Sequence, residues 1–369
     1  MAGGEDFERE GLLDGLDERE REARLDLLRQ LDEAGVSLAA LKKACEEDRL
    51  AVLPIEHIFS EDLRYTVDDA IEMSGLSPDF MRRDMLALGL PLPGAGEPAF
   101  SEADVEAFTA LKQLLDSGFP EESILELARV NGRGARQTAE AILEKFVRTF
   151  LRAGDTERDA GLRFAELARA FMPGLGPLVV TPLQFHMREM VRREVVGRAE
   201  VMAGELPGAR DVTVAFADLV GFTHLSSQSS VEELGDLTGR LEQLASEVAE
   251  PPVRLIKLIG DAAMLAAPEA GALVGATKRL VATVAAQDGL PQLRAGVAAG
   301  RALNRSGDWY GHPVNLASRL TDAADPSCLL ATDEVASATA QDFAWSPVGT
   351  RQLKGIDEPV SVFSLSADG

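Results

Sequence analysis

The apolar pattern of this chain changes its period near residue 208, and this change limits the folds that the chain can adopt. Before that point, as in residues 16–33, leucines recur at three- and four-residue steps among charged side chains. Such spacing predicts amphipathic helices. After Pro207 and Gly208 the sequence ARDVTVAFADL alternates and contains β-branched residues, which is typical of a strand. We therefore expect a domain boundary there, between an all-α half and a half that contains a sheet.

The first half is predicted to consist of helices joined by short loops. The sequence predicts helices at residues 16–33, 36–48, 101–116, 121–129, 135–152, 156–171 and 182–204, and loops at 91–98 and 171–178. We interpret residues 1–181 as a helical domain and residues 182–207 as a linker helix that leads into the second half.

Strands alternate with helices in the second half. Strands are predicted at 211–217, 253–259, 262–267, 292–299, 328–332, 343–350 and 360–365, and helices at 231–249, 269–287, 313–323 and 333–340. This order, with a hairpin at its centre, predicts an α+β sandwich of ferredoxin-like type over residues 208–369.

Charge and composition exclude several classes of protein. The chain carries 37 Lys and Arg against 61 Asp and Glu, a net charge of −24, which argues against a broad nucleic-acid surface. The acidic N-terminus does not resemble a signal peptide, and three prolines interrupt the uncharged run at 170–187. We therefore expect a cytoplasmic protein with no transmembrane segment. Cys45 and Cys328 offer neither a disulfide framework nor a metal-ligand pattern.

Two aspartates follow apolar strands at the points where the strands enter turns: Asp218 in FADLVGFT and Asp261 in KLIGDAAM. An aspartate at such a place is most often a turn or cap residue. Here the apolar flanks would hold both carboxylates rigidly at one edge of a sheet. Because Mg²⁺ favours oxygen ligands and phosphate partners, the pair is a candidate site for two metal ions.

The segment GDWYGHPVNLASRL, residues 307–320, predicts a loop followed by a helix. Asn315 and Arg319 lie four positions apart on one face of that helix. A capped helix with one polar stripe is the simpler interpretation. In a cleft, however, the guanidinium of Arg319 can stabilise negative charge that builds on a phosphoryl group.

Taken in order, FADLVGFT, KLIGDAAM, GDWYGHPVNLASRL and the LKG of residues 353–355 resemble the motif series of class III nucleotidyl cyclases. The resemblance covers about residues 208–367. The helical half, with YTVDDAIEMSGLSPDFMRRDMLALGLP, is similar to the N-terminal regulatory region of soluble actinobacterial adenylyl cyclases. These resemblances imply an adenylate cyclase that makes 3',5'-cyclic AMP and pyrophosphate from ATP, with two Mg²⁺ or Mn²⁺ ions per site. They also imply a homodimer in which each site combines residues of both protomers.

The resemblance assigns roles residue by residue. The metal ligands would be Asp218, Asp261 and the backbone carbonyl of Leu219. Substrate would be bound by Lys257 and Asp308, which read the purine, and by Lys354 and Phe222. The catalytic residues would be Asn315, which orients the ribose, and Arg319, which stabilises the transition state.

The choice of base can be argued from hydrogen bonds. Adenine presents an acceptor at N1 and a donor at N6, so Lys257 can donate to the first and Asp308 can accept from the second. Guanine presents the reverse pattern and would leave these groups unpaired, at a cost of about 1–3 kcal/mol each. ATP is therefore the predicted substrate. A guanylyl cyclase and a catalytically inactive, cyclase-like scaffold are the alternatives.

The helical half suggests three regulatory hypotheses. Residues 65–108 resemble a MerR-type winged helix, but two basic against nine acidic residues there argue against a DNA-binding regulator. The resemblance to actinobacterial cyclases implies responses to lipid and pH, so residues 170–187 could line a pocket for a fatty acid. An ordinary buried helix-loop-helix is the alternative. Histidines change charge near neutral pH, which makes His186 a candidate pH switch and His312 a second one.

Overall fold

The computed structural model describes residues 4–194 and 209–366, and the chain divides into two compact units, Met1–Arg193 and Glu194–Gly369. Each unit has hydrophobic cores of its own. The predicted linker at 182–207 begins inside the last helix of the first unit, and its residues 195–207 lie outside the described part of the chain.

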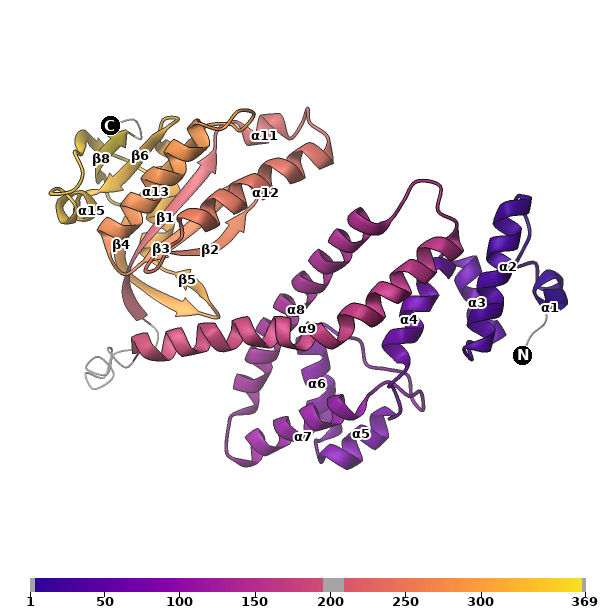
Figure 1. The fold of residues 1–369 in the computed structure, drawn as a ribbon. Coiled ribbons are helices and arrows are strands. Elements are labelled where there is room, and N and C mark those ends of the chain that lie inside the picture. The colour runs from indigo at the N-terminus through magenta and orange to yellow at the C-terminus, as the bar shows by residue number, and fades with distance from the viewer. Residues whose placement is uncertain (1–3, 195–208, 367–369) are drawn as a thin grey trace. The chain divides into compact units, whose positions relative to one another are not determined.

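The first unit is all-α, as predicted (Figure 1). Its elements are α1 (Gly4–Arg9), α2 (Glu18–Glu33), α3 (Leu38–Glu46), the 3₁₀ turn η1 (Leu50–Val52), α4 (Leu53–Ser60), α5 (Val67–Ser74), α6 (Pro78–Leu88), α7 (Glu102–Asp116), α8 (Glu121–Phe150) and α9 (Glu157–Glu194). Capping boxes at Asp17, Thr66 and Ser101 start α2, α5 and α7, because side-chain oxygens accept from N–H groups that the helix leaves free.

Two apolar clusters hold this unit together. Phe7, Leu27 and Leu41 belong to the first cluster, which α1 to α4 enclose. Phe80 and Phe108 belong to the second, which α5 to α8 enclose. The predicted winged-helix-like segment therefore lies within the second cluster and shares its core with α8.

A single helix replaces two predicted ones at residues 121–152. The prediction placed a break between 121–129 and 135–152, whereas α8 continues through the glycines of the NGRG segment. A glycine costs a helix only about 1 kcal/mol. At Gly132 a Cβ would lie 2.2 Å from the carbonyl oxygen of Leu88, so this glycine lets α6 approach α8 closely. The prediction mistook a packing residue for a helix end.

The predicted loop at 171–178 is also wrong, because α9 runs through Pro173, Pro177 and Pro182. A proline accepts the helical φ angle but removes one hydrogen bond and crowds the preceding turn, so it can bend a helix without ending it. Figure 1 shows α9 bending near its middle, where these prolines lie.

The apolar side chains of residues 170–187 lie on the surface of α9. Leu178, Leu183 and Phe185 are 57–67% exposed on one continuous helix, so the alternative of a buried helix-loop-helix is wrong. The fatty-acid pocket stays a prediction. Across residues 4–194 and 209–366, no helix is both long enough and apolar enough to span a membrane.

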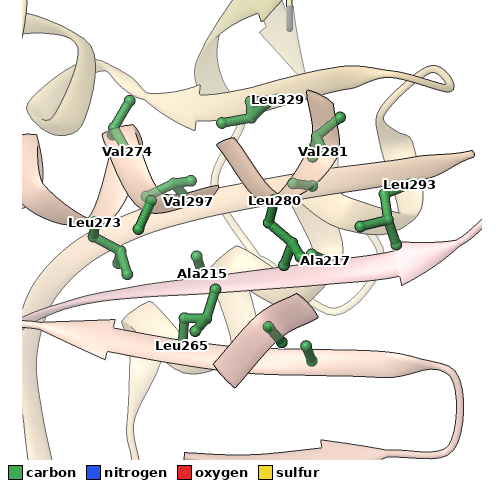
Figure 2. Close-up of a cluster of buried hydrophobic side chains, with 14 of the residues drawn as sticks. Ala215, Ala217, Leu265, Leu273, Val274, Leu280, Val281, Leu293, Val297 and Leu329 are labelled. Carbon is green, nitrogen blue, oxygen red and sulfur yellow. The ribbon is translucent and has the colours of Figure 1, made fainter. Parts of the chain in front are cut away.

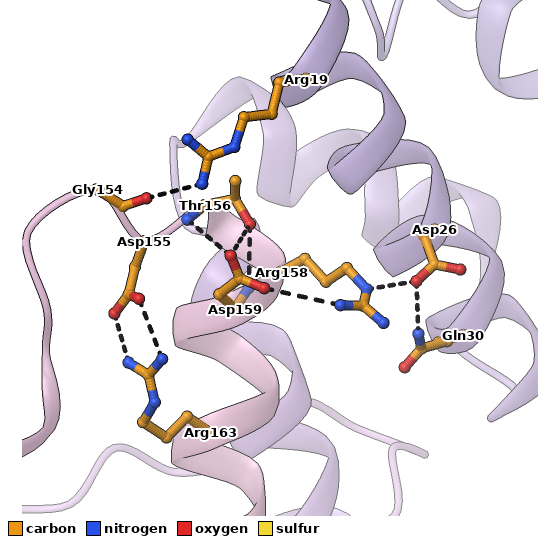
Figure 3. A network of polar contacts seen from close by, with 9 residues as sticks. All are labelled: Arg19, Asp26, Gln30, Gly154, Asp155, Thr156, Arg158, Asp159 and Arg163. Atoms are coloured by element: carbon orange, nitrogen blue, oxygen red, sulfur yellow. Dashed lines mark hydrogen bonds and ion pairs between the residues drawn. The ribbon is translucent and has the colours of Figure 1, made fainter.

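Polar contacts join α2 to the beginning of α9. Arg158 pairs with Asp26, as Figure 3 shows. Nearby, the guanidinium of Arg24 donates to both carboxylate oxygens of Glu157, at 2.6 and 2.7 Å, and both side chains are mostly buried. A bidentate ion pair of this kind fixes the orientation of both side chains. It ties together two helices that are far apart in sequence.

The second unit is built on an eight-stranded sheet with the order β2-β3-β1-β4-β6-β8-β7, in which β5 pairs with β4. The strands are β1 (Ala209–Leu219), β2 (Arg254–Ile259), β3 (Ala262–Ala267), β4 (Leu293–Arg305), β5 (Asp308–Tyr310), β6 (Cys328–Thr332), β7 (Ser346–Arg351) and β8 (Val360–Ser366). The helices are α11 (Phe222–Leu225), α12 (Val231–Val248), α13 (Ala270–Ala285), α14 (His312–Ala323) and α15 (Asp333–Ala338). The described strand pairs are antiparallel except β4 with β6.

Helices cover both faces of this sheet. Figure 2 shows Ala215 and Ala217 of β1 packed with Leu280 of α13 on one face. Val214 and Phe216 pack with α14 on the other face. Side chains alternate along a strand, so odd-numbered residues of β1 belong to the first face and even-numbered residues to the second. The predicted α+β organisation is confirmed.

α14 lies very close to β4 at Gly296. A Cβ there would lie 2.3 Å from the backbone nitrogen of Thr321 and 2.4 Å from the carbonyl oxygen of Ala317. Gly296→Ala should therefore push α14 off the sheet and lower the free energy of unfolding in urea by about 1–3 kcal/mol. Gly239→Ala in α12 is the matched control, since nothing lies within 4 Å of its Cβ. Equal losses in the two variants would contradict this packing.

Candidate active site

Asp218 and Leu219 are the last two residues of β1, a central strand of the sheet. Asp218 lies opposite Ala262 of β3 and Arg294 of β4. The alternation along β1 places it on the α14 face, next in line after Phe216. Its side chain is 18% exposed. Asp218 is therefore a mostly buried carboxylate at the end of a rigid strand.

Asp261 lies beside Asp218, in the tight turn between β2 and β3. Gly260 turns the chain with a φ of 63°, and the N–H of Leu219 donates to the carbonyl oxygen of Asp261 at 3.2 Å. The pKa of the Asp218 carboxyl is raised, chiefly by burial and further by the negative charge of Asp261. The hydrogen bonds from Arg294 lower this pKa and offset part of the rise. Two carboxylates held together in this way favour a cation between them.

A divalent metal ion fits these residues. Mg²⁺ and Mn²⁺ prefer carboxylate and carbonyl oxygens, and a bound cation would relieve the repulsion between Asp218 and Asp261. The described residues contain no group of three or more His, Cys, Asp and Glu that could hold a metal. Two carboxylates, the predicted carbonyl of Leu219 and substrate phosphates would therefore have to complete the coordination.

Arg294 is a residue of this site that the sequence analysis missed. Its Nε and Nη2 donate to Oδ2 of Asp218 at 3.2 and 2.9 Å, and its Nη1 donates to the carbonyl oxygen of Asp322 at 2.9 Å. Arg294 thus fixes the direction of the Asp218 side chain and connects it to the end of α14. A charged residue in the predicted strand at 292–299 was the available signal, because a strand buried on both faces has few reasons to carry one.

Lys257 and Asp308 form an ion pair. Lys257 lies on β2 opposite Met264, whose side chain is buried on the α14 face. The hairpin of β4 and β5 brings Asp308 to it, and the second carboxylate oxygen of Asp308 accepts from the N–H of Trp309 at 2.9 Å. The two residues predicted to read the purine are therefore in contact, although they are far apart in sequence.

α14 presents its polar face outward. Leu316, Ala317 and Leu320 are buried against the sheet, whereas Asn315 is exposed and Arg319 is half-exposed. Arg319 donates to the carboxylate of Asp322 at 3.1 Å, one turn further along the helix. Within the part of the chain that the structure describes, no hydrogen bond or ion pair joins Asn315 or Arg319 to Asp218 or Asp261.

The other predicted site residues lie in different surroundings. Phe222 starts α11 and packs against the core between the sheet and α13, on the face opposite to α14. Lys354 is exposed in the loop between β7 and β8, next to the buried Leu353. His312 is exposed at the first residue of α14, and His186 is exposed on α9 in the first unit.

Comparisons with known proteins identify both units. The family model "Adenylate cyclase regulatory domain" matches residues 5–191, and "Adenylate and Guanylate cyclase catalytic domain" matches residues 206–367. A protein named pH-sensitive adenylate cyclase from Mycobacterium tuberculosis is 38% identical over 85% of this chain and 81% of its own length. A protein named adenylate cyclase from Streptomyces coelicolor is 33% identical over 77% of this chain and 74% of its own.

A comparison with solved structures also found a similar protein. The adenylyl cyclase CyaB of P. aeruginosa is 23% identical, with a TM-score of 0.39, over 42% of this chain and 94% of that one.

The contacts of Arg294 predict how its loss affects the site. Arg294→Gln removes the counter-charge of Asp218 beside Asp261, so the metal-free protein should lose about 1–3 kcal/mol of unfolding free energy. Added Mn²⁺ should then raise the thermal unfolding midpoint more in this variant than in the unchanged protein. Arg240→Gln is the control, because Arg240 contacts the side chain of Gln287 and the carbonyl oxygen of Asp288 but, among the described residues, no carboxylate. If the metal-free Arg294→Gln variant is as stable as the unchanged protein, Arg294 does not balance the charge of Asp218.

Proposed function

The chain belongs to the family of class III adenylate cyclases with an N-terminal regulatory domain, and we propose that two copies of it build shared catalytic sites. In these sites ATP would be converted to 3',5'-cyclic AMP and pyrophosphate. The observation that carries the proposal is the adjacency of Asp218 and Asp261, on the sheet face that also holds the Lys257–Asp308 pair.

In the proposed reaction the ribose 3'-hydroxyl attacks the α-phosphorus in line, and pyrophosphate leaves. Two bound divalent ions would supply Lewis acidity, lowering the pKa of the hydroxyl and holding the phosphates. The carboxylates of Asp218 and Asp261 would bind those ions. Arg319 neutralises charge on the α-phosphoryl oxygens, a contribution of about 3 kcal/mol, while Asn315 orients the ribose. Lys354 is exposed and follows the buried Leu353, and its side chain would contact the triphosphate.

The Lys257–Asp308 pair supports ATP as the substrate. In the structure the ammonium of Lys257 and the carboxylate of Asp308 pair with one another. Adenine can separate them and still leave both paired, because N1 accepts from Lys257 and the N6 amino group donates to Asp308. Guanine would place a donor before the ammonium and an acceptor before the carboxylate, so both would lose their partners.

Exposed side chains support a site shared between two copies. Asn315 and Arg319 face outward and bind neither aspartate of their own chain. Ile259, beside Asp261, is 50% exposed, and Tyr310, at the end of β5, is 54% exposed. A second copy arranged head to tail would cover them and bring its own α14 to the aspartates.

We assign control of the reaction to the helical unit. The regulatory-domain match supports this assignment, and a relative named pH-sensitive supports pH as the stimulus. His186 and His312 are both exposed. Their role as switches stays a prediction, as does a lipid ligand.

A shared site predicts that two inactive variants can complement one another. Asp218→Ala removes a metal ligand and Arg319→Ala removes the transition-state cation, so each variant alone should make less than about one-hundredth of the normal cyclic AMP. A mixed dimer keeps one intact site, and the mixture should regain about a quarter of the normal rate if subunits exchange freely. Cyclic AMP formation by equimolar mixtures measures this.

The control for complementation is a mixture of Asp218→Ala with Asp261→Ala. Both variants lose the same side of the site, so their mixed dimers contain no intact copy and should stay inactive. If dimers are present and the Asp218→Ala and Arg319→Ala mixture remains as inactive as this control, the site is not shared.

A further inference from the structure

The first unit contains an apolar cavity that the proposed reaction does not use. Its volume is about 560 Å³, which falls within the range of small-molecule sites. α6, α7, the loop between them and the first turns of α8 form its wall, with Met85, Phe100, Phe108 and Leu111 among the lining residues. α6 and α8, which form part of this wall, are in close contact at Gly132.

Asp84 is an unusual residue in this wall. It lines the cavity from α6, is only 2% exposed, and forms no hydrogen bond or ion pair with any residue that the structure describes. The other polar residues in the lining are Asp104 and Asn131. Asp104 is already engaged, since its carboxylate accepts from the N–H and hydroxyl of Ser101 in the capping box of α7. Asp84 is therefore the buried carboxyl of this cavity that lacks a partner.

We propose that this cavity binds a small apolar molecule carrying an ammonium group, with Asp84 as the counter-ion. The apolar wall would hold the body of the ligand, and the carboxylate would accept hydrogen bonds from its ammonium group. The surrounding charge favours a cation, because residues 65–131 carry 13 acidic and four basic side chains.

The surroundings of Asp84 support this choice. Burial raises the pKa of its carboxyl, and no partner acts against that effect. A cationic ligand supplies the missing counter-charge, so it binds more tightly than a neutral ligand of the same shape. An anionic ligand, such as a fatty acid, would bring a second carboxylate against Asp84 and is disfavoured.

Three probes of nearly equal shape separate these possibilities: 1-naphthylmethylamine, 1-naphthylmethanol and 1-naphthoic acid. The naphthalene fluorescence anisotropy reports binding to the full-length protein directly. We expect the amine to bind at least ten-fold more tightly than the alcohol and the acid to bind more weakly than either. Equal binding of amine and alcohol, tighter binding of the acid, or no binding of the amine would each overturn the proposal.

Two variants locate the binding. Asp84→Asn keeps the shape of the side chain and should weaken the amine at least ten-fold while changing the alcohol less than two-fold. Glu106→Gln removes the same charge from an exposed position of α7 outside the cavity lining and should change neither. Should Asp84→Asn fail to fold, Ala107→Leu narrows the cavity and should weaken both probes. Amine binding that neither cavity variant changes would place the probe elsewhere and refute the assignment.

Discussion

The candidate active site depends on the seating of α14 against β4. Gly296 lacks a side chain at the point where the backbone of α14 crosses it, and the helix lies so close that a single methyl group has no room. That approach lets Arg294 reach the carbonyl oxygen of Asp322 while it holds Asp218. This contact buries the apolar face of α14, so Asn315 and Arg319, on the other face, point outward.

Electrostatics adds a second constraint at the same edge. Asp218 lies at the end of β1 and Asp261 in the β2–β3 turn, and the backbone hydrogen bond from Leu219 to Asp261 keeps them together. A cation can balance the repulsion between them, and within the chain Arg294 supplies one. A divalent ion would take up the same role with a higher charge. Metal binding and the direction of the Asp218 side chain are therefore coupled through Arg294.

Local sequence was sufficient to predict that Asp218 and Asp261 follow apolar strands, but not the extent of all helices of the first unit. Asp218 and Asp261 could be found because strand alternation and a Gly-Asp turn are short-range signals. Arg294 was missed because its importance comes from lying opposite Asp218 in the sheet, which only the register shows. Gly132 and Pro173 misled the helix predictions, because tertiary packing and the flanking turns decide whether such residues end a helix. The cavity at Asp84 required α6, α7 and α8 to be assembled first.

The most direct test of the account is the relative turnover of ATP and GTP by the full-length protein with Mn²⁺ or Mg²⁺. If Lys257 and Asp308 read the base, ATP should yield cyclic AMP with a kcat/KM at least ten-fold above that of GTP, since two mispaired, partly buried groups cost about 1–3 kcal/mol each. Equal or faster conversion of GTP would contradict the assignment of these residues. An absence of product from both nucleotides would contradict the catalytic site itself.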